Sequence, residues 1–122
     1  MINMLDFMKS LLEKLSRAEL EVLTIELGSK SSVANFLDVN RSSLSRWCKK
    51  EFLPDIDNRI RITSLVLVLQ RLHKVFEPKT AKKWLEGINA HLANQRPVDL
   101  IKQGRIAEVL AAIEQTDLGA YS

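Results

Sequence analysis

Apolar residues recur at steps of three and four along most of this 122-residue chain, the spacing typical of helices that bury one face. The first such segment spans residues 4–15 and predicts a helix. Its apolar stripe, which we expect to be buried, consists of Leu5, Met8, Leu11, Leu12 and Leu15. The pattern therefore favours a helical protein from the first turns onward.

A capping box at residues 16–19 predicts the start of a second helix. The Ser16 side chain can accept a hydrogen bond from the amide of Glu19, whose carboxylate reaches back to the Ser16 amide. This helix should end at Gly28, because glycine readily takes the left-handed conformation that closes a helix. Its apolar side is formed by Leu20, Leu23 and Leu27.

The most apolar part of the chain, residues 62–76, predicts a long, largely buried helix. A buried strand over residues 65–69 is the alternative, but the repeat continues over several turns, Asp57 can cap the helix and Pro78 follows its end. Apolar residues lie on more than one side, so the helix is expected to join the two halves of the chain or to form a dimer seam. The repeating positions are Ile62, Leu65, Leu69, Leu72 and Phe76.

Prolines and a glycine divide the C-terminal third into further helices. Pro78 suits the first position of one helix, where its missing amide costs nothing, and another short helix follows Pro97. Gly104 separates that helix from a last amphipathic segment over residues 106–113. The final six residues, 117–122, form a short apolar tail that fits no periodic pattern.

Length and composition favour a folded helical protein of one compact unit, or of two small subdomains that share a core. Cys48 is the single cysteine and cannot form an intramolecular disulfide, and no apolar run reaches the roughly 18 residues needed to cross a bilayer. The N-terminus lacks the features of a secretory signal. We therefore expect a cytoplasmic protein with no membrane partner.

The positive charge is concentrated in one part of the sequence. The net charge is only +3, but residues 29–50 carry five bases and one acid, a sum of +4, whereas residues 1–28 carry three bases and five acids, a sum of −2. A basic segment beside a near-neutral remainder is typical of a surface that binds phosphates.

Residues 30–49 of this basic segment resemble a helix-turn-helix of the phage-repressor and Xre type. Ala34 is small where two helices would cross, and the larger apolar residues fill the wedge between them. One departure is Asp38, which stands where the turn usually has glycine, although Asp tolerates the left-handed conformation better than most residues. The residues that carry the resemblance are Val33, Ala34, Leu37, Val39, Leu44 and Trp47.

The second helix of this motif, from about Arg41 to Lys49 with Asn40 as its N-cap, would read DNA in the major groove. Arg41 and Arg46 can each donate two hydrogen bonds to guanine, and Asn40 can pair with adenine. The candidate DNA-binding residues are Asn40, Arg41, Ser42, Ser45, Arg46 and Lys49, with Lys30 and Ser32 as phosphate contacts. The alternatives are a solvated face of a helical bundle and a surface that binds a protein.

A second resemblance covers residues 81–119, which are similar to the toxin-binding domain of the Xre/MbcA/ParS antitoxins. Pro97 opens a Pro-x-Asp-Leu element thirteen residues after Trp84, and Gly104 follows Leu100 by four. Ile88 and Ala90 depart from the family, because many relatives have proline beside the position of Asn89. The residues that carry the resemblance are Ala81, Trp84, Leu85, Asn89, Leu92, Pro97, Val98, Asp99, Leu100, Gly104, Val109, Leu110, Ile113 and Gly119.

The resemblance implies an antitoxin that neutralises a NAD-consuming RES-domain toxin by blocking its active site and that represses its own operon by binding operator DNA. The toxin contacts would lie in the C-terminal region, where an aromatic side chain in an apolar tail can fill a cleft. The candidates are Arg96, Arg105, Leu118, Gly119, Ala120, Tyr121 and Ser122. A functionless, frayed terminus is the other interpretation of this tail.

Together these patterns predict an all-α fold with two domains. Residues 1–60 would form the Xre-like helix-turn-helix domain, and residues 61–122 the linking helix and the toxin-binding domain. We expect a homodimer or a toxin-antitoxin hetero-oligomer, and neither an enzyme nor a protein that holds a metal or cofactor. His73 and His91 lack further ligands at metal-binding spacing, and no glycine-rich phosphate loop is present. The rival hypothesis is a stand-alone repressor whose C-terminal half only dimerises.

Overall fold

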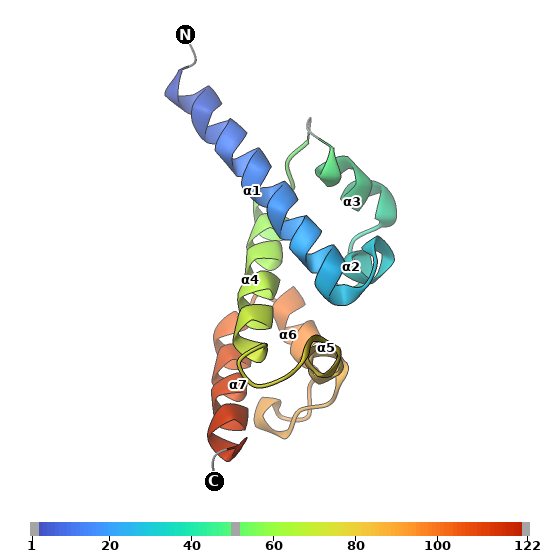
Figure 1. The fold of residues 1–122 in the computed structure, drawn as a ribbon, viewed down its shortest axis with the longest axis vertical. Helices are drawn as coiled ribbons and strands as arrows, with labels where there is room; N and C mark the ends of the chain where they lie inside the picture. The colour runs from blue at the N-terminus through green and yellow to red at the C-terminus, as the bar shows by residue number, and fades with distance from the viewer. Residues whose placement is uncertain (1–2, 50–51, 121–122) are drawn as a thin grey trace. The chain divides into compact units, whose positions relative to one another are not determined.

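The computed structural model describes the backbone of residues 3–49 and 52–120, and within these ranges the chain is helical and contains no β-strand (Figure 1). The all-α expectation is therefore confirmed. Two compact units are present, Met1–Ile62 and Thr63–Ser122, and the division falls within one long helix. The expected boundary followed residue 60. The separate function assigned to each unit stays a prediction.

The first unit is built on α1 (Met4–Leu27), which is one continuous helix. The expected break at Ser16 is wrong: Ser16 lies buried in the middle of α1, so its side chain caps no helix. Asn3 is the cap instead, and its Oδ1 accepts a hydrogen bond from the Asp6 amide at 2.8 Å. The helix ends at Gly28, whose φ of 95° lies in the left-handed region, as expected.

Helices α2 (Lys30–Leu37) and α3 (Arg41–Cys48) pack against α1 and against each other. Their shared apolar interior explains why these short helices are stable, since segments of eight residues rarely hold a helix alone. In Figure 1 the N-terminal turns of α1 extend beyond α2 and α3. The buried apolar residues of these three helices are Leu20, Leu23, Leu27, Val33, Ala34, Phe36, Leu37, Leu44 and Trp47.

The stripe that we expected α1 to bury is largely exposed. Leu5, Met8, Leu11 and Leu15 all face solvent in this chain, and Leu12 is half-buried. The physical reason is that α1 carries two apolar faces, and α2 and α3 cover only the face that contains Leu20, Leu23 and Leu27. The periodicity was interpreted correctly as helix, but the prediction of burial for this stripe was wrong.

The long helix α4 (Ile56–Leu72) begins earlier and ends earlier than the apolar pattern indicated. Asp57 lies inside its first turn rather than at the cap, and the alternative of a strand over residues 65–69 is excluded because these residues are helical. The side chains of Leu65, Val68, Leu69 and Leu72 are buried within this chain. The prediction that this helix is largely buried is thus confirmed for its second half.

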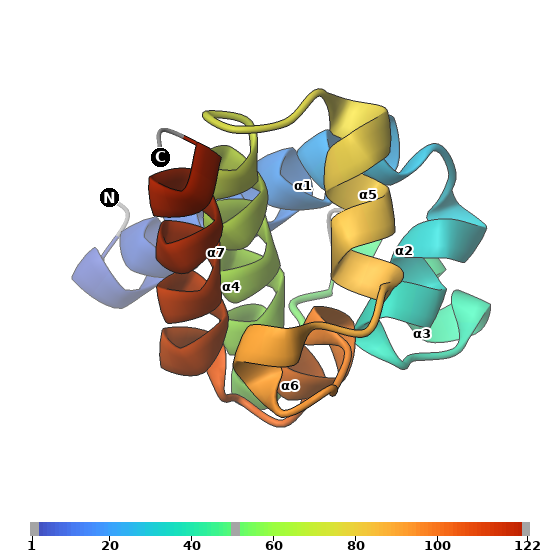
Figure 2. The same ribbon diagram turned by 90° about the horizontal axis from the view of Figure 1, so that it is seen from below.

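The second unit combines the end of α4 with α5 (Pro78–Glu86), the short 3-10 helix η1 (Ala90–Leu92), α6 (Pro97–Lys102) and α7 (Ile106–Ala120). Pro78 and Pro97 stand at the helix starts and Gly104 has a φ of 78° before α7, which confirms these expected boundaries. Helix α6 packs on α5 and α7, and α7 also packs on η1. The end of α4 and α7 lie side by side in both views (Figures 1 and 2).

Most residues that carry the C-terminal resemblance lie in the interior of this second unit. The loop between α5 and α6 is closed by a backbone bridge from Asn89 to Gln95, and the Asn89 side chain accepts a hydrogen bond from the His91 amide at 2.9 Å. No proline is therefore needed beside Asn89 to hold this loop. The buried members of the set are Ala81, Leu85, Leu92, Pro97, Val98, Leu100, Val109 and Ile113.

Candidate functional site

Helices α2 and α3 are joined by a tight turn whose geometry follows from its residues. Asp38 takes a left-handed conformation with φ 59° and ψ 46°, and the Val39 amide donates to the Ala34 carbonyl at 3.0 Å. Asn40 then caps α3, because its Oδ1 accepts a hydrogen bond from the Ser43 amide at 2.8 Å. Both expectations, an Asp38 turn and an Asn40 cap, are confirmed.

The inner face of α3 is anchored by Leu44 and Trp47, which are both buried. Anchoring at these two positions fixes the rotation of the helix and turns the opposite face outward. Arg41, Ser42 and Arg46 are exposed on α3, and Lys49 is exposed at its C-cap, whereas Ser45 is half-buried. The structure therefore groups most of the predicted DNA-binding residues on one helix.

The start of α2 lies beside this face. The Ser29 side chain caps α2 by accepting from the Ser32 amide at 3.1 Å, and the Ser29 and Ser32 hydroxyl oxygens are 3.3 Å apart. Arg41 reaches from α3 to donate a hydrogen bond to Ser31 Oγ at 2.9 Å. Lys30 is exposed at this helix start, and Ser32 is half-buried. The N-terminus of a helix with a cation beside it favours anionic groups.

The predicted polar anchors of the C-terminal region each form an ion pair within the chain. Arg96 donates two hydrogen bonds to Asp99 at 2.9 Å, and Arg105 donates to both carboxylate oxygens of Glu108 at 2.7 and 2.8 Å. Hydrogen bonds from Arg96 lower the pKa of Asp99, and those from Arg105 lower the pKa of Glu108. Each guanidinium is therefore held in a fixed orientation while it stays partly exposed.

The first residues of the apolar tail, which fitted no periodic pattern, continue α7 as far as Ala120. Residues 118–120 are helical, and the Leu118 side chain is exposed. Once a helix has formed, each further residue that is fixed in the helical conformation adds one backbone hydrogen bond. Helix α7 can therefore extend past its last buried turn. For Gly119 and Ala120 only the backbone is described, and Tyr121 and Ser122 lie outside the described residues.

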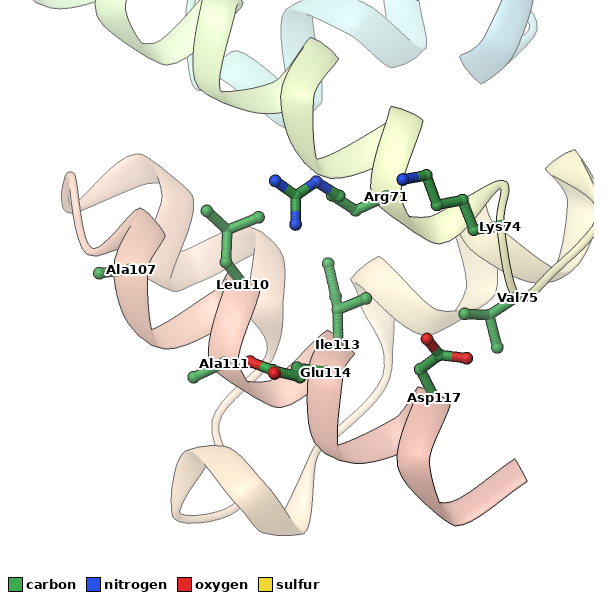
Figure 3. Close-up of a pocket in the computed structure, with 9 residues that line it drawn as sticks. All are labelled: Arg71, Lys74, Val75, Ala107, Leu110, Ala111, Ile113, Glu114 and Asp117. Carbon is green, nitrogen blue, oxygen red and sulfur yellow. The ribbon is translucent and has the colours of Figure 1, made fainter. Parts of the chain in front are cut away.

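A cleft of about 520 Å³ lies between the end of α4 and α7, and sequence reasoning missed it (Figure 3). Arg71 and Lys74 line it from the α4 side, and Glu114 and Asp117 from α7. Its apolar lining includes Val75, Leu110 and Ile113. The spacing of three within each charged pair was visible in the sequence. Only the packing of α4 beside α7 brings the two pairs to one cleft.

Metal sites and membrane spans can be assessed for the described residues. Within residues 3–49 and 52–120, no group of three or more His, Cys, Asp or Glu side chains is arranged to hold a metal ion. Over the same ranges, no helix combines the length and the apolar character that a membrane span requires.

Comparisons with known proteins agree on one family, although no family model matches the chain. The mycobacterial cidal antitoxin MbcA of Mycobacterium tuberculosis is 28% identical over 89 residues, which are 73% of this chain and 79% of MbcA. A protein described as a probable mycobacterial cidal antitoxin of the same organism is 31% identical over 90 residues, which are 73% of this chain and 76% of that protein.

A solved structure shares the fold over nearly the whole chain. It is a chain of the M. tuberculosis MbcT-MbcA toxin-antitoxin complex, with a TM-score of 0.70 and 24% identity, and the likeness covers 97% of both chains. The extent of this likeness shows that the arrangement of helices is common to both. By sequence identity and coverage, the chain belongs to the family of the mycobacterial cidal antitoxin MbcA.

Proposed function

We propose that this chain is the antitoxin of a toxin-antitoxin pair, that its C-terminal unit blocks the active site of a NAD-consuming RES-domain toxin, and that its N-terminal unit represses the operon by binding operator DNA. Both activities are binding rather than catalysis, and both would take place in the cytoplasm. Membership of the MbcA family and the likeness to a chain of a toxin-antitoxin complex support the toxin partner. The basic helix-turn-helix supports the DNA partner.

The observation that carries DNA binding is the inward anchoring of α3. Because Leu44 and Trp47 are buried, Arg41, Arg46 and Lys49 are all turned toward solvent. A helix of this kind places its N-terminal part in the major groove, where arginine pairs with guanine. Lys30 and Lys49 would contact phosphates, which supply affinity without sequence specificity.

The toxin-blocking surface is proposed at the end of α7. Leu118 is a large apolar side chain left exposed on the last turn, and the neighbouring Asp117 lines the cleft between α4 and α7. Arg96 and Arg105, each oriented by its ion pair, could donate further hydrogen bonds to polar groups of the toxin. The contact would then include Gly119, Ala120, Tyr121 and Ser122 together with this cleft.

Co-expression with the product of the adjacent gene tests the proposal. If that gene encodes a RES-domain protein, its expression alone should deplete cellular NAD and stop growth, and co-expression of this chain should restore both. The two proteins should also co-purify. A chain that binds operator DNA yet neither co-purifies with the adjacent product nor restores NAD would instead support the stand-alone repressor.

A further inference from the structure

Helix α1 carries a second apolar face that stays exposed in the described part of the first unit. Seven residues follow one another at steps of four and three without interruption, and every one of them is exposed. The exposed fraction of Met4 and of Ile25 is 72%, and that of Leu15 is 56%. We name this face the α1 seam; it consists of Met4, Met8, Leu11, Leu15, Ala18, Val22 and Ile25.

The alternating steps of four and three residues indicate what kind of structure packs against the α1 seam. An apolar stripe that repeats at the a and d positions of a heptad over several turns is the contact line of a coiled coil. Over the first two turns the exposed Leu5 and Phe7, at e and g positions, widen this stripe. In this register Met8, Leu15 and Val22 occupy a, and the other four seam residues occupy d. The seam follows a helix of 24 residues, about 36 Å at 1.5 Å per residue. The occupant is therefore another long helix.

We infer that the occupant is α1 of a second copy of this chain, packed antiparallel about a two-fold axis. The seam is self-complementary in that arrangement, as a two-fold interface requires. Met8 then faces Ile25 of the second copy, and Leu15 faces the small Ala18, so that large and small side chains interdigitate. A parallel pair would instead stack Ala18 on its own copy and leave a gap.

Charges that flank the seam favour the same orientation. Lys14 and Glu21 are exposed and occupy the g positions of successive heptads. In the antiparallel pair, Lys14 of each copy lies beside Glu21 of the other, which gives two attractive contacts. A parallel pair brings Lys14 beside Glu19 but also sets Glu21 against Glu26, so attraction and repulsion offset each other. Contacts at e and g positions set the orientation of paired helices.

The inference of pairing through the α1 seam does not depend on toxin binding or on DNA binding, because it is drawn from the exposure and spacing of the seam residues and from the flanking charges. Its consequence for DNA does rest on the proposed function: two joined copies would present two α3 helices to the two half-sites of an operator. Operator binding and pairing are measured separately, so failure of one is distinguishable from failure of the other.

The mass of the full chain in solution is the direct test. Analytical ultracentrifugation of the Cys48→Ser chain should give twice the chain mass, and the added pair Leu11→Glu and Leu15→Glu should return it to the mass of one chain. Both leucines are exposed in the single chain, so helicity by circular dichroism should be kept. Ser10→Glu adds one glutamate to an exposed position of α1 outside the seam and should leave the dimer intact.

Disulfide trapping tests the orientation and does not depend on the glutamate variants. In the Cys48→Ser chain, Met8→Cys together with Ile25→Cys should form a covalent dimer on oxidation, and Met8→Cys alone should not. A parent chain that sediments as a monomer at every concentration, or a dimer that survives the two glutamates, overturns the pairing. Efficient cross-linking of Met8→Cys alone overturns the antiparallel arrangement.

Discussion

Arg41 at the start of α3 donates a hydrogen bond to Ser31 Oγ on α2, with a nitrogen-to-oxygen distance of 2.9 Å. The bond crosses between the two helices of the helix-turn-helix and holds the guanidinium on the side of α2. One Nη atom is engaged in this way, while the side chain stays exposed. An arginine that is oriented before it meets DNA loses less side-chain entropy when it binds.

Operator affinity should depend on both arginines of α3 and, to a smaller degree, on Ser31. Arg41→Ala and Arg46→Ala should each weaken specific binding by about 1–3 kcal/mol, the range for a bidentate contact to a base. Ser31→Ala keeps the arginine but removes its orientation, so its effect should be smaller than that of Arg41→Ala. Gel-shift titrations at fixed salt measure all three.

Arg105→Ala serves as the control, because it removes the same charge from the second unit and should leave operator affinity unchanged. Arg41→Ala and Arg46→Ala should still neutralise the toxin. Equal operator affinity for the parent and the Arg41→Ala, Arg46→Ala double variant would exclude α3 as the recognition helix.

Asn40 should contribute to stability as well as to DNA binding, since its side chain caps α3 at 2.8 Å from the Ser43 amide. Asn40→Ala should lower the free energy of unfolding by about 1 kcal/mol. Asn40→Asp keeps the cap and should keep the stability, but it adds a negative charge where DNA is proposed to lie. In thermal unfolding, Asn40→Ala should be less stable than the parent and Asn40→Asp, which should be equally stable. Operator affinity should fall for both variants.

The sequence predicts those boundaries that backbone chemistry decides locally. Pro78 and Pro97 open helices, Asp38 forms the turn and Asn40 caps α3, because each depends on one residue and its neighbours. Ser16 satisfied the same local rules for a helix start, yet α1 continues through it. Tertiary packing decided that case, since Ser16 is buried within the helix, and no local pattern reveals burial.

The candidate site was predictable to the same extent. The outward residues of α3 follow from the inward positions of Leu44 and Trp47, and the sequence indicated both. The cleft between α4 and α7 was not predictable, because it needs two helices distant in sequence to pack side by side. The exposure of the α1 seam was missed for a related reason: hydrophobic periodicity identifies an apolar face but not the surface that covers it.

Asp38 holds a conformation that most side chains avoid, which makes its substitutions a test of the turn. With φ at 59°, Asp38→Val should destabilise the protein by about 1–2 kcal/mol, because a branched side chain clashes in the left-handed region. Asp38→Gly removes that steric cost and should be the most stable of the three. Denaturant unfolding gives the order; a valine variant as stable as the parent would show that the turn has another conformation in solution.

The ion pair between Arg96 and Asp99 should make the free energy of unfolding depend weakly on pH in the acidic range. Hydrogen bonds from Arg96 lower the pKa of Asp99 below its ordinary 3.8, so the folded state favours the ionised form. The contribution is present above pH 3.8 and is lost as pH falls through the lowered pKa. Since the pair is partly exposed, its size should be at most about 1 kcal/mol.

Asp99→Asn should remove this part of the acid dependence and leave the rest of the profile unchanged. Unfolding free energies of the parent and the variant, measured from neutral to acidic pH, give the difference directly. The two curves should converge at low pH, and a constant separation would assign the loss to packing around α6 rather than to the ion pair.

Truncation of the chain after Asp117 tests the proposed toxin-blocking surface. The buried residues of α7, Val109, Ala112 and Ile113, all precede the cut, so the variant should remain folded. It loses the exposed Leu118 and everything after it, and it should fail to restore NAD and growth in cells that express the toxin. Gln115→Ala changes an exposed position on the same helix and should still protect. If the truncated chain protects cells as well as the parent does, the end of α7 does not block the toxin, and the contact must lie elsewhere on the second unit.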